Sequence, residues 1–349
     1  MKKLFIYILL SAFIVTGCSS SKTISDSAST TLPVTSSEDA VDEKVEFEIL
    51  ESDELKALKV DESQEVMVLM YHNIGEAEAT WTRTPENFRR DLETLYNNGF
   101  RAISLEDYAL GNIATEKGHT PVVITFDDGN ENNFRYLDNG EIDPTCAIGI
   151  LESFKADFPD FNTTATFFLN QLAFGSKSQE VDKLKFLAQN GYSIGNHTLT
   201  HLDLKKASPE DIQKEIALLK STHESTYPEL NIQTLALPYG AKPSDENYAL
   251  TYKGLFDNIS YDNIAVLLVG WDPYFSPYHK DFDFSKIRRV RASETNVDGV
   301  GLYDWLKAYE QGTKFRYISD GNPATISIPE SKQELIQSSK FQDKKIITY

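Results

Sequence analysis

VVITFDDG, residues 122–129, joins an apolar run to two carboxylates and a glycine. The run from Val122 to Phe126 has the length and composition of a buried strand. Successive side chains on a strand point to opposite faces, so Asp127 and Asp128 can serve one site only where the backbone turns. Gly129 permits such a turn. We therefore expect both carboxylates at the end of a strand; a strand followed by a plain acidic turn is the alternative.

Two histidines, His197 and His201, follow a second short strand, YSIG at residues 192–195. Their spacing of four places both rings on one face of a helical turn, where they can bind one ion. Two imidazoles and a carboxylate, here Asp128, are a common ligand set for a divalent metal that keeps positions open for water. Asp127 is then free to take a proton from that water, which predicts a metal-dependent hydrolase. Two surface histidines at chance spacing are the alternative.

Short apolar runs alternate with amphipathic stretches along the chain. This pattern is typical of an α/β fold with a parallel sheet covered by helices. Barrels of this type place their chemistry at the carboxyl ends of the strands. The candidates at this rim are His72, Asp127, Asp128, His197 and Tyr239. We expect strands at residues 66–71, 101–103, 122–126, 165–169, 192–195, 234–237, 264–268 and 287–291, and helices beginning near residues 85, 104, 146, 181, 208 and 302.

The N-terminus has the features of a targeting segment. Two lysines precede an apolar run, Leu4 to Val15, that is too short to span a bilayer. IVTGC at residues 14–18 resembles a bacterial lipobox, in which Cys18 would be diacylated and anchor the chain to the membrane. We expect a lipoprotein signal peptide at 1–18, a disordered tether rich in Ser, Thr and acids at 19–64, and a single compact domain at 65–349. An ordinary secretory signal with a chance cysteine is the alternative.

The charge of the chain limits its partners. Its 349 residues carry a net charge of −19, which argues against nucleic acid because phosphate binding needs a basic surface. Residues 38–65 contribute strongly, with 12 acids against 3 lysines. Of the 2 cysteines, only Cys146 would remain apart from the lipidated one, so no disulfide is expected within the chain. The sequence gives no sign of a protein partner.

Four motifs resemble the NodB-homology polysaccharide deacetylases, carbohydrate esterase family 4. They are TFDDG at 125–129, HTLTH at 197–201, LPYG at 237–240 and ATFF at 165–168, and the resemblance spans roughly residues 66–291. It implies a distorted (β/α) barrel that hydrolyses N-acetyl or O-acetyl groups on a polysaccharide. It also implies that a divalent metal, zinc before cobalt or nickel, is the main electrophile, with the backbone at Tyr239 helping to hold the oxyanion. The resemblance assigns Asp127 as the base and Asp128, His197 and His201 as the metal ligands.

The chain departs from the pattern of this family in its later motifs. Ala236 stands where the family usually has an arginine that orients the base, and no Leu-x-His supplies a general acid. His72, at the end of the first strand, could donate the proton to the leaving amine; a capped loop histidine is the alternative. Arg289 or Arg291 could replace the missing arginine against Asp127; surface charge on an edge strand is the alternative.

Other conspicuous side chains have ordinary interpretations. The remaining histidines lie in polar segments and are expected to be solvated: His119, His223 and His279. Trp271 and its aromatic neighbours could stack on sugar rings, although aromatic clusters more often form core.

Three functions compete. The first is a membrane-anchored, extracytoplasmic deacetylase that removes acetyl groups, N-acetyl before O-acetyl, from an envelope or extracellular polysaccharide. The second is a non-catalytic lipoprotein that binds glycans or acts as a scaffold on the same fold, which the missing arginine and histidine favour. The third, a solute-binding lipoprotein of a transporter, predicts two lobes and no metal triad and ranks last.

Overall fold

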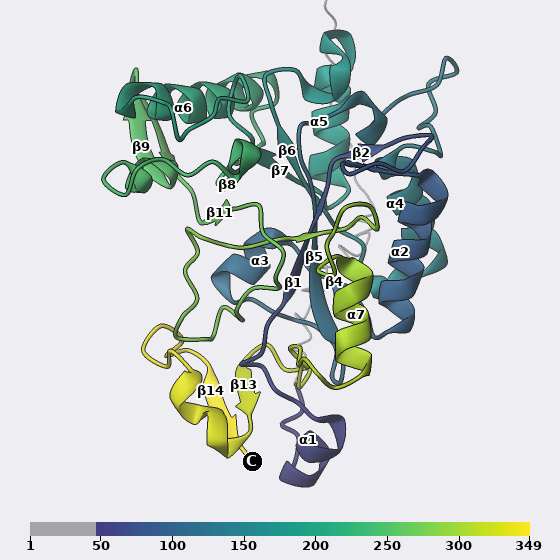
Figure 1. Ribbon diagram of the computed structural model, residues 1–349, viewed down its shortest axis with the longest axis vertical. Helices are drawn as coiled ribbons and strands as arrows, with labels where there is room; N and C mark the ends of the chain where they lie inside the picture. The colour runs from purple at the N-terminus through teal and green to yellow at the C-terminus, as the bar shows by residue number, and fades with distance from the viewer. Residues whose placement is uncertain (1–46) are drawn as a thin grey trace, which may run out of the picture. The chain divides into compact units, whose positions relative to one another are not determined.

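The computed structural model describes residues 47–349 (Figure 1). The predicted signal peptide, Cys18 and most of the predicted tether therefore lie outside the described residues. None of the described helices has the length and apolar character that crossing a membrane requires.

A parallel sheet of eight strands forms the centre of the domain. The order is β11-β8-β7-β6-β5-β1-β12, with β4 pairing beside β6 along the same edge of β5. The strands are β1 Met67–Tyr71, β4 Phe100–Ala102, β5 Thr120–Phe126, β6 Thr166–Leu169, β7 Ser193–Asn196, β8 Thr234–Ala236, β11 Ala265–Leu267 and β12 Val290–Arg291. Their interiors are almost entirely buried, as expected for strands covered on both faces.

The sheet curls until one segment reaches both of its edges. Ile287 bridges in parallel to Leu267 of β11, and a few residues later Val290 pairs with Leu69 of β1. The predicted distorted (β/α) barrel is thus confirmed. Closure brings the carboxyl ends of all these strands to one rim, where the candidate site residues lie.

Helices cover the sheet, and their starts follow from the sequence. Thr84, Ser104 and Ser208 each accept a hydrogen bond from a backbone N–H of the first turn that follows. Phe88 and Leu92 of the helix after Thr84 are buried against the sheet. The helices are α2 Pro85–Asn97, α3 Leu105–Leu110, α4 Ala147–Asp157, α5 Glu180–Gln189, α6 Pro209–Thr226 and α7 Leu302–Glu310, and Figure 1 shows α2 beside α4.

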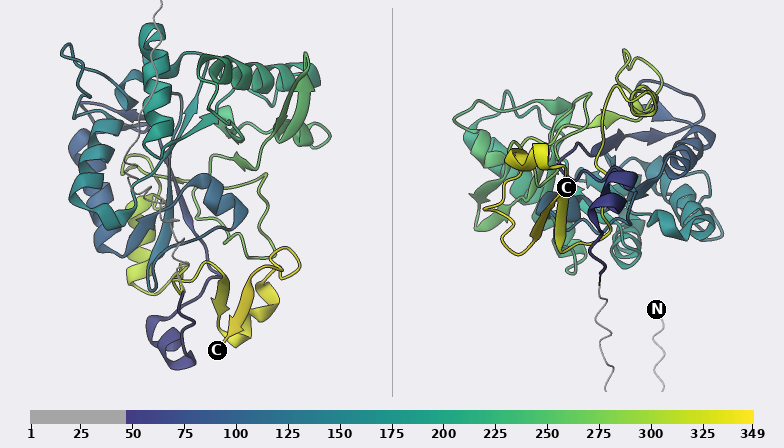
Figure 2. Two further views of the ribbon diagram at one scale, coloured as in Figure 1. Left: turned by 180° about the vertical axis from the view of Figure 1, so that it is seen from behind. Right: turned by 90° about the horizontal axis from the view of Figure 1, so that it is seen from below.

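The predicted tether is wrong at its C-terminal end. Residues 52–58 form helix α1 (Ser52–Leu58), and Leu50, Leu55 and Val60 are buried against the end of the chain. That end forms a parallel pair, β13 (Thr325–Ile328) with β14 (Lys345–Thr348), which lies at the same end of the domain as α1 (Figure 2). The many acidic residues led to the prediction of a tether, although three nearby apolar residues, Leu50, Leu55 and Val60, are buried in one cluster.

Two further elements were not predicted. β9 (Lys253–Phe256) and β10 (Ile259–Asp262) form an antiparallel hairpin that packs on α6. The residues of its tight turn, Asp257 and Asn258, both have positive φ, which Asp and Asn tolerate better than most residues. Near the rim, β2 (Asn73–Ile74) pairs with β3 (Thr82–Arg83) and shapes the loop after the first strand.

Candidate metal centre

The two aspartates lie at a sharp turn at the end of β5. Asp128 has φ 75° and Gly129 φ 60°, so the backbone leaves the extended conformation as expected. A side chain at Gly129 would also come within 2.8 Å of Leu169. As a result the neighbouring carboxylates enter different surroundings: Asp127 is 2% exposed, whereas the Asp128 side chain is 29% exposed.

Asp128, His197 and His201 converge on one point. The Nε2 atoms of both histidines lie 3.4 Å from Oδ1 of Asp128, and one ligand atom from each residue lies within 4.8 Å of the others. Burial raises the pKa of Asp128, but the hydrogen bonds from the two imidazoles outweigh it and hold that pKa far below its usual range. Three converging donors, one of them kept anionic, fit a divalent cation with open positions for water.

The histidine pair does not lie on a helical turn, contrary to the prediction. Thr198 and His201 both have positive φ, at 62° and 59°, so the segment is an irregular loop after β7. The two rings still come together, with their centroids 4.9 Å apart. Non-glycine residues in this conformation are held against a local energetic cost, and such strain is concentrated at functional sites.

Hydrogen bonds to the backbone orient this loop. Nδ1 of His197 lies 2.8 Å from the carbonyl oxygen of Ala236, which it can approach only as a donor, leaving Nε2 free to bind metal. Asn170, at the end of β6, donates through Nδ2 to the carbonyl oxygens of His197 and Thr198, at 2.7 and 3.0 Å. Metal ligands are commonly fixed by outer partners of this kind.

His223 is fully buried behind the same loop, so the prediction that it is solvated was wrong. Its Nε2 donates to the carbonyl oxygen of Asn170 at 2.9 Å, and its Nδ1 lies 3.1 Å from Oε1 of buried Glu180. Burial lowers the pKa of His223, although the Asn170 and Glu180 contacts act in the opposite direction. Helical spacing from Ile212 and Ile216 was the signal that placed this ring on the inner face of α6.

The other two histidines differ from each other. His279 is also buried, at 8% exposed, contrary to prediction, and its ring stacks on Phe275. His119 is partly exposed, with a side chain at 29%. Neither belongs to the metal centre.

Asp127 faces Arg289 in a bidentate ion pair. The two guanidinium nitrogens donate to its two carboxylate oxygens at 2.6 and 2.7 Å, and Arg289 itself is completely buried. Thr125 and the carbonyl oxygen of Leu268 hold the same guanidinium. Burial raises the pKa of Asp127, but the charges of Arg289 and His197 outweigh it and the pKa is lowered. Arg289 thus lies where an orienting arginine would be needed, and it is not surface charge.

His72 and Tyr239 flank the aspartates and the ligands. Nε2 of His72 lies 3.8 Å from Oδ2 of Asp127, and the ring packs on Trp81 with centroids 4.7 Å apart. Burial lowers the pKa of His72, against the raising effect of Asp127 and Asp128. Tyr239 has φ 59°, is 70% exposed, and its ring lies 4.5 Å from that of His201. The residues predicted from sequence are thus brought together, while their chemical roles stay predictions.

The arrangement can carry out a hydrolysis. It combines a cation site, a buried carboxylate kept anionic beside it, an imidazole within reach of that carboxylate and an exposed face for a substrate. Arg291, the other arginine considered for Asp127, is not its partner and lies in a neighbouring pocket.

Comparisons with known proteins find polysaccharide deacetylases. The family model described as polysaccharide deacetylase matches residues 114–255, which contain Asp127, Asp128, His197, His201 and Tyr239. YxkH of Bacillus subtilis strain 168, assigned to the polysaccharide deacetylases, is 27% identical over 233 residues, covering 65% of this chain and 75% of that protein.

Solved structures share the fold. A Bacillus anthracis protein assigned to the polysaccharide deacetylases is 23% identical with a TM-score of 0.50, covering 68% of this chain and 67% of its own. The Streptococcus pyogenes deacetylase PplD, solved with acetate, is 18% identical with a TM-score of 0.50, covering 68% of this chain and 98% of its own.

Proposed function

The chain contains a polysaccharide deacetylase domain with NodB homology, of carbohydrate esterase family 4, and on that premise we propose a metal-dependent deacetylase acting on an envelope or extracellular polysaccharide. N-acetyl groups are the preferred substrate over O-acetyl esters. The observation that carries the proposal is the convergence of Asp128, His197 and His201 beside the ion pair of Asp127 and Arg289.

Asp128, His197 and His201 would hold the ion, with zinc favoured and cobalt or nickel as substitutes. When bound, such an ion polarises the acetyl carbonyl and lowers the pKa of water. Asp127 takes the proton from the attacking water, and Arg289 keeps that carboxylate oriented and anionic. The backbone N–H of Tyr239 donates to the oxygen on which negative charge develops.

His72 completes the proton balance. Cleavage of an amide needs a proton on the departing nitrogen, because an amine anion is a very poor leaving group. His72 lies within 3.8 Å of Asp127 and can supply that proton, so that water and the N-acetyl sugar become acetate and a free amine. An ester needs this proton less, which is why the presence of His72 favours amides.

Acetate release tests the proposal. The protein would be treated with a chelator, reloaded with zinc, cobalt or nickel, and assayed on chitotetraose and on acetylated xylan. We expect release that follows the metal and is faster on chitotetraose. Metal binding without release from any acetylated glycan would instead support the non-catalytic glycan-binding or scaffolding alternative, which the lack of a late Leu-x-His motif for the general acid favours.

Membrane anchoring is a separate proposal that rests on the lipobox-like IVTGC sequence. Acylation of Cys18 would tether the catalytic domain outside the cytoplasm, close to envelope polymers. A Cys18→Ser variant expressed in a bacterium should lose incorporated palmitate and leave the membrane fraction. Retention of both would contradict lipidation at this residue.

A further inference from the structure

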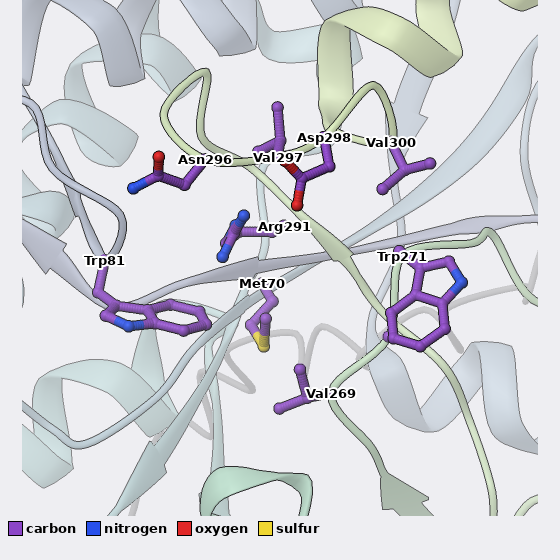
Figure 3. Close-up of a pocket in the computed structure, with 10 residues that line it drawn as sticks. Met70, Trp81, Val269, Trp271, Arg291, Asn296, Val297, Asp298 and Val300 are labelled. Carbon is purple, nitrogen blue, oxygen red and sulfur yellow. The ribbon is translucent and has the colours of Figure 1, made fainter.

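A pocket of about 230 Å³ lies among residues from the end of β1, from β12 and from the segments around Trp81, Trp271 and Asp298 (Figure 3). Trp81 forms one side of it and Trp271 another, and the segment from Asn296 to Val300 covers it. His72 packs on the same Trp81 ring. The Trp81 ring therefore lies between His72, the predicted proton donor, and the pocket. A sugar bound in the pocket would be the neighbour of the sugar that is deacetylated.

Arg291 lies in the middle of this pocket (Figure 3). Arg289, two residues earlier and just before β12, donates to both carboxylate oxygens of Asp127 and to two further acceptors. By contrast, within residues 47–349 the guanidinium of Arg291 has no ion pair, and its buried Nε has no hydrogen-bond acceptor. The guanidinium lies over the Trp81 ring, whose centroid is 5.0 Å from Cζ. An arginine with free donors that faces a pocket is suited to a planar anion.

The rest of the lining suits a sugar. Trp81 is 42% exposed and Trp271 is 62% exposed, so both rings offer apolar faces on which a pyranose can stack. Asp298 also lines the pocket and makes no ion pair with Arg291 in the described part of the chain. Its carboxylate can accept hydrogen bonds from sugar hydroxyls. A cation, an acceptor and two aromatic faces together match a sugar that carries a carboxylate.

We propose that this pocket binds a carboxylate-bearing sugar next to the acetylated sugar at the metal centre, with Arg291 as the carboxylate ligand. This rests on the proposed deacetylase function and deepens it, because it distinguishes an acidic glycan from a neutral one. In a chain with a net charge of −19, one unpaired arginine selects a single carboxylate at a fixed position along the substrate.

The test compares glycans of equal length. Chitotetraose is compared with a tetrasaccharide of alternating N-acetylglucosamine and N-acetylmuramic acid, which has the same linkages and adds a lactyl carboxylate. A hyaluronan tetrasaccharide forms a third arm, with the carboxylate on a uronic acid. We expect wild-type kcat/KM to be about ten- to a hundredfold higher on one of the acidic glycans than on chitotetraose, as a charged hydrogen-bonded pair implies.

The variant Arg291→Gln should reduce this preference to near unity. Lys253→Gln is the matched control: it removes the same charge from exposed β9, where the side chain pairs with Asp262, and should keep the preference. Quenching of tryptophan fluorescence by each tetrasaccharide gives the affinity independently of turnover, since two of the 3 tryptophans line the pocket.

Equal kcat/KM and equal affinity on all three glycans would overturn the proposal, as would an Arg291→Gln variant that keeps the preference. Acetate released from chitotetraose without any preference would remove the pocket assignment and leave the deacetylase function standing. Preferential, Arg291-dependent binding with no acetate released from any glycan would support the pocket assignment and contradict the deacetylase function.

Discussion

At the carboxyl ends of the strands, buried Asp127 faces the guanidinium of Arg289; at the opposite end, before β1, buried Glu62 faces no cation in the described residues. Glu62 instead accepts hydrogen bonds from the Tyr317 hydroxyl and the Ser327 N–H, both at 2.8 Å, and lies near buried Asp320. Burial, and then the charge of Asp320, raise the pKa of Glu62 well above its ordinary value. Two buried carboxyl groups of one domain are thus shifted in opposite directions.

The opposite pKa shifts of Asp127 and Glu62 distinguish the proposed catalytic rim from a structural site at the base of the barrel. At the rim, counter-charges keep a carboxylate ionised despite its burial, and a series of strained residues holds the surroundings in place: Asp128, Thr198, His201 and Tyr239 all have positive φ. At the base, neutral donors satisfy a carboxyl group whose charged form is disfavoured. Variants at the rim should therefore change turnover, and variants at the base should change stability alone.

Asp127→Asn should have the largest effect. The amide keeps the size of the side chain but cannot take a proton, so kcat should fall by about 10²–10⁴-fold. Binding of the metal should persist because Asp128, His197 and His201 are unchanged. Acetate release and bound zinc would be measured together, with Asp182→Asn on the exposed face of α5 as the control. Turnover within a few-fold of wild type would show that Asp127 is not the general base.

Arg289→Gln should come next. It leaves a buried carboxylate without its partner, a change that typically costs about 3–5 kcal/mol of folding free energy. Arg289 lowers the pKa of Asp127, so the stability from the pair is present above the ordinary value of 3.8 and is lost as pH falls through the folded value. Without Arg289 the pKa rises, and the acid limb of the kcat profile should move to higher pH.

Thermal unfolding and a pH–rate profile would measure both effects of Arg289→Gln. Arg316→Gln is the comparison for loss of a partly buried arginine, since Arg316 packs on Phe100 and has no contact with Asp127 in the described residues. An unmoved acid limb in the Arg289 variant would mean that Asp127 does not control the rate.

His223→Leu should weaken metal binding by up to about 10-fold, the lower end of the effect of losing a direct partner of a ligand, because His223 acts through Asn170. The leucine removes the donor to the carbonyl oxygen of Asn170, which in turn orients the loop of His197. His223→Gln retains an N–H donor and should recover part of the affinity. Competition with a chromogenic chelator, at a temperature where circular dichroism shows both variants folded, would measure this. Equal zinc affinity in all three proteins would limit His223 to packing.

Much of the barrel could be predicted from sequence because its strands are short, apolar on both faces and separated by capped helices. The side chains of Thr84 and Ser208 cap the helices that follow them, so the local sequence alone predicts where these helices begin. Helix α1 and the β9–β10 hairpin were missed for a different reason. Their residues are mostly charged or polar, and what fixes them is contact with segments distant in sequence, such as Leu55 with the C-terminal strand.

The site could be predicted only as far as strand order allows. Residues after parallel strands meet at one rim, so Asp127, Asp128 and the histidines were expected together. That Arg289 rather than Arg291 meets Asp127 depends on the register of the closing strand, which no local pattern encodes. His223 was misjudged because the polar character of its neighbours was weighed above the helical spacing that turns it inward.

Glu62→Gln at the base should have the smallest effect and should leave acetate release unchanged. Because the folded pKa of Glu62 is raised, its contribution to stability is complete below the ordinary value of 4.5 and is lost as pH rises through the folded value. Glutamine cannot ionise, so the variant should lose this part of the decline in melting temperature above pH 4.5. Each unit of pKa shift corresponds to about 1.4 kcal/mol.

The comparison of the two ends is sharpest in this variant, since the same chemical change, carboxyl to amide, is made at Asp127 and at Glu62. Melting temperatures from pH 4 to pH 8 and kcat on chitotetraose would be measured for both. A Glu62→Gln variant with wild-type melting behaviour and reduced kcat would show that the base of the barrel is coupled to the rim. An unchanged kcat, with a melting temperature that depends less on pH, would show that burial of the Glu62 charge affects folding stability and not catalysis.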